Sequence, residues 1–389
     1  MAKNKVCMLL YQYYYVDSRV QNYVTTLLDM GMEVHVICLR HEAHSQIHQD
    51  GLKIIEIPMD RKSKNRNYFF EYLKSTLYFF LFTTINEIKN GYRIIHIHNM
   101  PDFLVFAAVL PKILGCKLIL DIHDPMPEFF LSKFRLQENS FFYTLLKIEE
   151  KISSIFADKV ITANPNFKEA LAHRGIPPHK ITVVANVADP NLFNNHIKRE
   201  KDGTKYILIF PGTLSARYGL DIPIRALPAL IKTIPNILVR YIGPFNEYTD
   251  ELNKLAVELK VEDHFEIIDL IPLEEVPQYL ASAHIGIYPA LTDPHMSIAT
   301  PGKVLEYVAM NLPVVASKLK ALTVFFPADC ITYFETGNTD EFTRCIIRLY
   351  EHPQEVEELL KNTQKKYIEK YTFEKEQAKY RELLSDWLK

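Results

Sequence analysis

The stretch TPGKVLEYVAMNLPVVAS, residues 300–317, joins a short predicted helix to an apolar strand. Thr300 suits the cap of that helix, and Pro301 suits its first position, where the missing N–H of proline would have no partner anyway. The run PVVAS at 313–317 is apolar up to its last residue, which is typical of a strand buried on both faces. A helix that leads into such a strand is the repeating unit of a parallel α/β sheet.

The same alternation of strands and helix-length segments extends along the chain in both directions. In the first half we expect strands at 5–11, 33–39, 53–58, 94–99, 117–124, 158–163 and 180–186. After a polar run at 194–205 the pattern restarts, with strands at 205–212, 237–243, 264–270, 285–290 and 313–317. The sequence therefore predicts an α/β fold of two doubly wound, Rossmann-like parallel-sheet domains, over residues 1–200 and 201–370. Such sheets bind ligands beyond the carboxyl ends of their strands, so we expect the two domains to face a central cleft.

Composition and missing motifs limit the function further. The net charge of −2 argues against a nucleic-acid-binding protein that works through bulk charge. The five cysteines show no metal-ligand spacing, so we expect reduced thiols in a cytoplasmic protein. The chain has no GxGxxG, no GxxxxGK[ST] and no DxD motif, so no dinucleotide cofactor, P-loop or metal-held diphosphate is expected.

One segment points to a membrane. Residues 61–82, RKSKNRNYFFEYLKSTLYFFLF, join a basic run to an aromatic run. The apolar part is too short to span a bilayer and contains Glu71 and Lys74. Two interpretations stay open for 61–86: a core-facing helix with a basic lead-in, or a helix that lies on an anionic membrane surface at the inner face of the membrane.

Lys303 lies in the first turn of the predicted helix, where the helix dipole favours anions rather than cations. A strand, a loop and a helix N-terminus with an added lysine would form an anion site. Glu306, one turn further, could accept hydrogen bonds from the two hydroxyl groups of a ribose, which together with a phosphate makes a nucleotide. The alternative, a solvent-facing Lys303–Glu306 pair, stays open.

A second stretch with phosphate-binding character is PGTLSARYGLD at 211–221. Gly212 ends the first strand of the second domain, and Arg217 lies in the loop that follows. The planar guanidinium suits phosphate recognition. If strands 205–212 and 285–290 are neighbours, Arg217 and Lys303 converge on one diphosphate; otherwise Arg217 is a surface arginine.

Polar residues also cluster after two strands of the first domain. DIHDPMPE at 121–128 is too polar for a core, and His123 could donate a hydrogen bond to a sugar hydroxyl or to a developing charge. HIHN at 96–99 brings His98 to a neighbouring strand end, with His96 on the same side by alternation. The alternative is that His123 is held by Asp124 in a turn.

Together these stretches resemble the retaining glycosyltransferases of the GT-B fold in family 4 (glycosyl transferases group 1). YVDSRVQNYVTTLLDMGMEVHVICL at 15–39 is similar to the family's D-x-R-V loop, helix and strand, and DIHDPMPE to its D-x-H-d-x-x-P-E signature. VVANVADPNLF at 183–193, PGTLSARYGLD and the stretch at 300–317 are similar to its three later motifs in the same order. The resemblance covers nearly the whole chain. It also implies that a last helix at 371–389 crosses back to the first domain.

The resemblance implies roles for the matched residues. His123, Arg217 and Lys303 would be catalytic: the two cations would hold the donor diphosphate, and His123 would contact the donor sugar. The implied donor-binding residues are Gly212, Thr213, Arg217, Lys303 and Glu306. The implied acceptor or cleft residues are Asp17, Arg19, His98 and Asp124. No metal and no cofactor is implied beyond the nucleotide-sugar donor. Where many members carry a further glutamate, this chain has Ile298, which leaves the donor sugar open.

The sequence thus predicts a retaining glycosyltransferase that acts on a glycan or lipid-linked acceptor, in surface polysaccharide or glycolipid synthesis. Two alternatives remain: a non-catalytic partner protein that binds nucleotide sugars, and a GT-B nucleotide-sugar epimerase.

Overall fold

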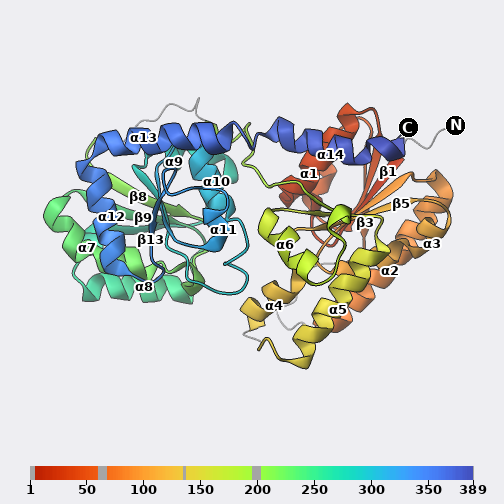
Figure 1. Ribbon diagram of the computed structural model, residues 1–389, viewed down its shortest axis with the longest axis horizontal. Helices are drawn as coiled ribbons and strands as arrows, with labels where there is room; N and C mark the ends of the chain where they lie inside the picture. Colours follow the sequence, from red (N-terminus) through yellow and green to blue (C-terminus); the bar gives the residue numbers. More distant parts are fainter. Residues whose placement is uncertain (1–4, 60–67, 135–136, 195–202, 389) are drawn as a thin grey trace. The chain divides into compact units, whose positions relative to one another are not determined.

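The computed structural model describes residues 5–59, 68–134, 137–194 and 203–388 (Figure 1). The chain forms two compact units, one made of Met1–Asn186 and Glu374–Lys389, the other of Val187–Phe373. The second unit begins ahead of the expected boundary at residue 200, because the apolar end of the VVANVADPNLF motif packs into its core through the buried Phe193. The second unit is therefore inserted into the chain of the first.

The first unit contains a parallel sheet of seven strands in the order β3-β2-β1-β4-β5-β6-β7. Its strands are β1 Lys5–Leu10, β2 Glu33–Leu39, β3 Leu52–Ile57, β4 Ile94–His98, β5 Lys117–Ile122, β6 Lys159–Thr162 and β7 Ile181–Val183. The expected strands of this half are all present. The sheet is covered on both faces, which explains why its central strands are continuously apolar.

Helices on both faces complete the first unit. They are α1 Ser18–Asp29, α2 Tyr68–Asn90, α3 Val109–Ile113, α4 Met126–Phe134, α5 Phe141–Phe156 and α6 Pro165–His173, together with the 3₁₀ helix η3 Asp102–Ala108. The last helix of the chain, α14 Phe373–Leu388, packs on this unit through the buried side chains Tyr380, Leu383 and Leu384. Trp387 also packs against that core, and Lys159 Nζ lies 5.0 Å from the centre of its ring.

The second unit contains a six-stranded sheet in the order β10-β9-β8-β11-β12-β13, and its pairs are parallel. Its strands are β8 Tyr206–Pro211, β9 Ile237–Ile242, β10 Phe265–Ile268, β11 Ile285–Tyr288, β12 Val314–Ser317 and β13 Thr332–Phe334. The sequence predicts all of them except β13, which has only three residues. Its helices are α7 Asp221–Thr233, α8 Glu247–Glu258, α9 Val276–Ser282, α10 Gly302–Ala309, α11 Lys320–Thr323, α12 Thr339–Glu351 and α13 Pro353–Thr363.

Two further expectations concern the environment of the chain. All five cysteines are free and buried. Among the described residues no helix combines the length and the apolar character that a membrane crossing requires.

Candidate active site

A cluster of charged and imidazole groups lies at the carboxyl ends of the adjacent strands β4 and β5. Asp121 is fully buried there and pairs across the sheet with His98. Its Oδ2 atom lies 3.0 Å from His123 Nε2 and 3.4 Å from His98 Nδ1. The ring nitrogens of the two histidines, His98 Nδ1 and His123 Nε2, are 3.2 Å apart. The two predicted histidines therefore meet, and a buried carboxylate lies between them.

Arg19, in the first turn of α1, completes this cluster. Its Nε and Nη2 atoms donate to the two oxygens of Asp121, each at 3.0 Å. Its Nη1 atom donates to the Val184 carbonyl at 2.9 Å and to Asn186 Oδ1 at 2.6 Å. All three guanidinium nitrogens are thus used within the first unit. Arg19 ties α1 to β5 and to the segment that leads out of this unit.

The electrostatics of the cluster follow from burial and charge. Burial favours the neutral form of Asp121, but the charges of Arg19 and His123 outweigh it and hold the pKa of that carboxyl well below its usual value. Burial also opposes a charge on His123, yet the Asp121 carboxylate raises the pKa of His123 above 6.5. At His98 burial dominates and lowers the pKa. His123 is therefore the better proton or hydrogen-bond donor of the two.

His96 lies on the same side of β4 as His98, as strand alternation predicts, with the ring centres 4.2 Å apart. His96 is fully buried, and its Nδ1 atom lies 3.0 Å from the hydroxyl of Tyr380 in α14. Burial lowers the pKa of His96 well below its usual value, so it is neutral. The last helix of the chain therefore reaches the base of the histidine cluster.

The other predicted residues of the first unit have structural partners. Asp17 caps α1 by accepting a hydrogen bond from the Val20 N–H at 3.0 Å. The Asp124 carbonyl accepts a hydrogen bond from Asn99 Nδ2 at 2.7 Å, and the His123 N–H donates to Asn99 Oδ1 at 2.8 Å. The side chain of His123 is held by Asp121 and not by Asp124, so the turn-capping alternative is wrong.

One group of side chains has the composition of a metal site. His96, His98 and Asp121 each offer a ligand atom, and these atoms lie within 4.8 Å of one another. Both oxygens of Asp121, however, already accept hydrogen bonds from Arg19. The guanidinium supplies the positive charge that a cation would bring, so this group fits an ion-paired network better than a metal centre.

In the second unit the two predicted cations lie on adjacent strand–helix connections. β8 and β11 are hydrogen-bonded neighbours, with Gly286 opposite Ile209. This meets the condition under which Arg217 and Lys303 were expected to lie close together. Lys303 lies in the first turn of α10, and its Nζ atom is 4.8 Å from the centre of the Tyr218 ring. Because Arg217 precedes Tyr218 in the same 3₁₀ turn, the loop that carries Arg217 lies beside Lys303.

Lys303 has an unusual environment for a lysine. Its ammonium group lies over the rings of Phe210 and Tyr218, at 5.2 and 4.8 Å. Within the ranges that the structure describes, Lys303 forms no ion pair. The alternative interpretation, a solvent-facing ion pair between Lys303 and Glu306, is therefore wrong. Burial lowers the pKa of Lys303 and raises the pKa of Glu306. Lys303 and Glu306 are thus both partly buried, and their charges act on each other without a direct ion pair.

Arg217 is a third exposed and pairs with Asp293, Nη2 to Oδ2 at 2.9 Å. Its Nε atom is buried, and no described residue accepts a hydrogen bond from it. Asp293 also accepts from the Met296 N–H, so it fixes the loop before α10 as well as Arg217. Arg217 is therefore a positioned side chain with hydrogen-bonding capacity left. Thr213 is exposed in the same loop.

The start of α10 differs from the prediction. The helix begins at Gly302, Pro301 occupies the cap position, and no side chain caps the helix. The Thr300 hydroxyl is buried and has no partner among the described residues. The free N–H groups at this end are therefore not satisfied by the threonine, which was expected to cap them.

Gly212 leaves room for Lys303. Its φ of +122° favours glycine, and a β-carbon there would lie 2.3 Å from Lys303 Cε. We expect Gly212→Ala to displace the ammonium group, to lower the free energy of unfolding by about 1–2 kcal/mol, and to weaken nucleoside-diphosphate binding about tenfold. Calorimetry of unfolding and of binding measures both effects. Gly337→Ala is the matched control, because Gly337 has a φ of +81° and open space around it; equal binding losses in both variants would contradict the role of Lys303.

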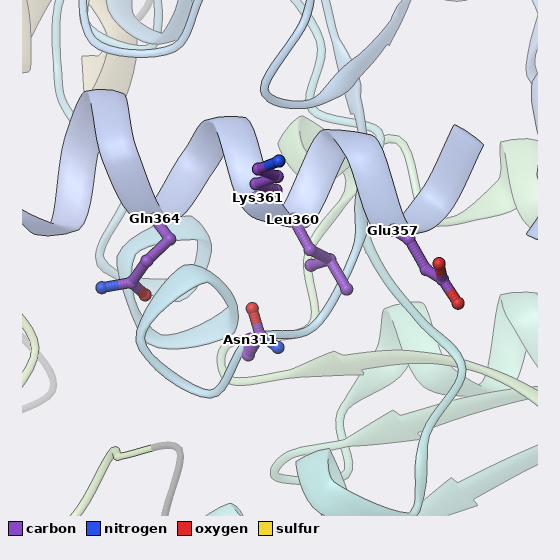
Figure 2. A pocket seen from close by; sticks show the side chains of 5 residues that line it. All are labelled: Asn311, Glu357, Leu360, Lys361 and Gln364. Atoms are coloured by element: carbon purple, nitrogen blue, oxygen red, sulfur yellow. The ribbon is translucent and has the colours of Figure 1, made fainter. Parts of the chain in front are cut away.

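A surface hollow on the second unit lies apart from these residues. It is lined by Asn311, Glu357, Leu360, Lys361 and Gln364, and Figure 2 shows that most of these side chains come from α13 and its end. Asn311 follows the carboxyl end of α10, whereas Lys303 lies at its amino end. The length of the helix, about 12 Å at 1.5 Å per residue, separates them. The hollow is not part of the candidate site.

Sequence reasoning missed three residues that hold the site together: Asp121, Asp293 and Tyr380. Asp121 stands two residues before His123, a spacing that places both side chains on one face of a strand, so a signal was present. Asp293 lies in a loop without a recognisable motif. Tyr380 is 284 residues away from His96 along the chain, and no local pattern connects them.

Comparison with known proteins places the chain in a family. Residues 16–192 match Glycosyltransferase Family 4, and residues 205–352 match Glycosyl transferases group 1. A GDP-mannose-dependent alpha-(1-6)-phosphatidylinositol monomannoside mannosyltransferase of Mycolicibacterium smegmatis is 30% identical over 132 residues, 33% of this chain and 34% of the relative. An MMP alpha-(1->4)-mannosyltransferase of Mycolicibacterium hassiacum is 20% identical over 239 residues, 60% of this chain. The matched region spans 54% of that second relative, so neither match covers two thirds of the protein concerned.

Solved structures share the fold over nearly the full length. A glycosyltransferase of Rickettsia africae superposes with a TM-score of 0.76 at 14% identity, over 99% of both chains. Anabaena HepE in complex with UDP-glucose superposes with a TM-score of 0.71 at 17% identity, over 98% of this chain and 99% of its own. With two parallel-sheet units and both family matches in the expected order, the chain belongs to glycosyltransferase family 4 and has the GT-B fold.

Proposed function

We propose that this protein transfers a sugar from a nucleotide-diphosphate sugar to a glycan or lipid-linked acceptor, with retention of the anomeric configuration and without a bound metal. One observation carries the proposal. Lys303 is a partly buried ammonium group that forms no ion pair with a carboxylate of the described chain, and it lies at the amino end of α10 beside the Arg217 loop. An anion is what such a group lacks.

The donor is proposed to bind on the second unit. Lys303 and Arg217 would hold the diphosphate, with Gly212 and Thr213 beside it. Glu306 would accept hydrogen bonds from the ribose hydroxyls, and the burial that raises its pKa also strengthens such bonds. The UDP-glucose complex of HepE and the GDP-mannose named for the mycobacterial relative support a nucleotide sugar as the donor class.

The first unit is proposed to serve the sugar and the acceptor. His123 would donate a hydrogen bond to a sugar hydroxyl, since the Asp121 carboxylate keeps its imidazole readily protonated. His98 and Arg19 would act through Asp121, which they both contact. Asp17 and Asp124 fix the backbone of the loops at these strand ends, and their side chains stand beside the acceptor region in this proposal.

The proposed chemistry breaks the bond between the anomeric carbon and the phosphate oxygen. Negative charge then grows on the departing diphosphate, where Lys303 and Arg217 stabilise it more than they stabilise the bound donor. The acceptor hydroxyl forms its new bond on the same face of the sugar, and the departing phosphate oxygen takes the hydroxyl proton. No carboxylate nucleophile is required, unlike in most retaining glycoside hydrolases.

Donor hydrolysis tests the proposal. The purified protein is incubated with UDP-, GDP- and ADP-sugars, and the released nucleoside diphosphate is measured, with water as the acceptor. We expect release from one donor and none from the others, and release from that donor about 10²- to 10³-fold slower with Lys303→Ala. Saturable binding of a nucleoside diphosphate without turnover, even when candidate acceptors are added, would indicate a non-catalytic binding protein. An absence of binding would overturn the donor site.

A further inference from the structure

Helix α5 turns its polar side toward the protein and its apolar side outward. Glu150, Ser153 and Ser154 are fully buried, and Glu150 is ion-paired with Arg174. The outward stripe is apolar, with exposed fractions between 44% and 83%: Phe141, Phe142, Leu145, Ile148, Ile152 and Ile155. A surface helix normally has the opposite arrangement, because water solvates its polar face. The outward face of α5 is therefore built to meet something other than water.

Helix α2 also carries an apolar outward stripe, although its inward side includes aromatic residues that pack on the core. Ser75, Thr83 and Glu87 are buried together with Phe79. The outward side carries large aliphatic residues at a helical spacing: Leu73, Leu77, Leu81, Ile85 and Ile88, which are 46% to 72% exposed. Of the two interpretations of 61–86, the core-facing helix is confirmed for Phe79 and the aromatic residues around it, but it does not account for the outward stripe. The segment 61–67 lies outside the described residues.

The stripes of α2 and α5 form one surface. Both helices pack against η3, and α2 also contacts α3. Figure 1 shows α2, α3 and α5 gathered along one side of the first unit. Between them they carry more than half of the exposed large hydrophobic side chains of the described chain. We call this surface the apolar face; it consists of the two stripes with Val109, Ile113, Leu114 and Phe134. Contiguous patches of this kind mark interaction sites.

The charges on the apolar face select the partner. Along the described parts of α2 and α5 the exposed charged residues are lysines, Lys74, Lys89 and Lys151, and no acidic residue is exposed there. Protein–protein interfaces are enriched in aromatic residues and depleted of lysine, whereas this face is mainly aliphatic and edged with lysines. Anionic lipid headgroups with acyl chains beneath them match both properties.

We propose that the apolar face lies on an anionic lipid bilayer. The face adjoins the histidine cluster through α4, which starts three residues after His123 and ends at Phe134. The rings of Phe130 and Phe134 are 5.2 Å apart, and those of Phe130 and Phe142 are 6.2 Å apart, so α4 joins the site loop to the face. This arrangement favours a lipid-linked acceptor over a free glycan, an inference that rests on the proposed transferase function.

Vesicle flotation tests the proposal on the full chain, without donor or acceptor. We expect the protein to float with vesicles of phosphatidylcholine and phosphatidylglycerol, and much less with phosphatidylcholine alone. Ile148→Ser with Ile152→Ser, or Leu77→Ser with Leu81→Ser, should reduce flotation about tenfold or more. Val257→Ser with Leu273→Ser is the matched control. These two residues lie in the second unit, and their exposed fractions of 61% and 50% are similar to those of the residues changed on the apolar face. Lys74→Gln with Lys151→Gln should reduce flotation with vesicles that contain phosphatidylglycerol and leave flotation with phosphatidylcholine alone unchanged.

Three results would overturn the proposal: a wild-type protein that does not float, face variants that float as well as the wild type, or a wild-type dimer that the face variants convert to monomers without any vesicle binding. The last result would assign the face to a second copy of the chain. Thermal unfolding of each variant shows whether it is folded. Because flotation needs no donor and donor hydrolysis needs no vesicles, this proposal and the proposed function can fail separately.

Discussion

Lys303→Ala lowers kcat by about 10²- to 10³-fold, by analogy with the loss of one preorganised donor to a developing negative charge. The reason is that no carboxylate of the described chain forms an ion pair with the ammonium group, so the departing diphosphate can contact it directly. The measurement is the rate of nucleoside-diphosphate release at saturating donor. Lys232→Ala, at an exposed lysine in the last turn of α7, is the control and keeps the wild-type rate.

Lys303→Met separates charge from packing. Methionine keeps an unbranched side chain over the Phe210 and Tyr218 rings and removes the ammonium group. We expect the same loss of kcat as for alanine, together with an increase of about 0.5–2 kcal/mol in the free energy of unfolding, because a buried cation without a partner is costly. A loss of rate below about threefold in either variant would remove Lys303 from the proposed leaving-group role.

Asp121→Asn lowers the free energy of unfolding by about 3–5 kcal/mol, as expected when one partner of a buried ion pair is removed. The substitution leaves Arg19, whose side chain is 11% exposed, without its carboxylate. Denaturant titration measures the effect. Asp29→Asn is the matched control, since Asp29 pairs with Arg381 at the surface, where the side chains are 55% and 44% exposed, and such pairs contribute about 0–1 kcal/mol. Similar losses in both variants would contradict a special role for the buried pair.

The effect of Asp121→Asn depends on pH in two ranges. The pKa of Asp121 is lowered in the folded state, so its stabilisation is complete above the usual value and is lost as the pH falls toward the folded value. The pKa of His123 is raised by Asp121, so that stabilisation is present below 6.5 and is lost as the pH rises through the folded value. We therefore expect the difference between wild type and variant to be larger near pH 6 than near pH 8.5. A difference that grows with pH would contradict the pairing.

The strands could be predicted from the sequence because burial on both faces requires continuous apolar runs, and few other elements have them. β13 was missed because three residues are too few to show a pattern. α5 and α2 illustrate a different limit. Their periodicity is visible in the sequence, but it does not say which side of a helix faces the protein, and here the usual assumption is wrong.

The sequence could bring candidate residues together where polar residues follow strands, which is how His98 and His123 were predicted to lie close to each other. The partners of those residues were harder to predict. Whether Lys303 pairs with Glu306 depends on side-chain rotamers and on the rings of Phe210 and Tyr218, which come from another connection. Spacing along one helix could not decide between the two alternatives.

The insertion of one unit into the other also sets an order for synthesis. Tyr380, which contacts His96, is made 284 residues later. By then every residue of Val187–Phe373 has been made, so this unit can fold on the ribosome while the sheet of the first still lacks the helix that covers Tyr23 and His96. The unit whose synthesis begins first is thus the last to complete its fold. Its final step is the docking of α14, which is slow because the contacts that form are far apart in the sequence. A nascent chain released before α14 emerges would expose the base of the histidine cluster to chaperones and proteases.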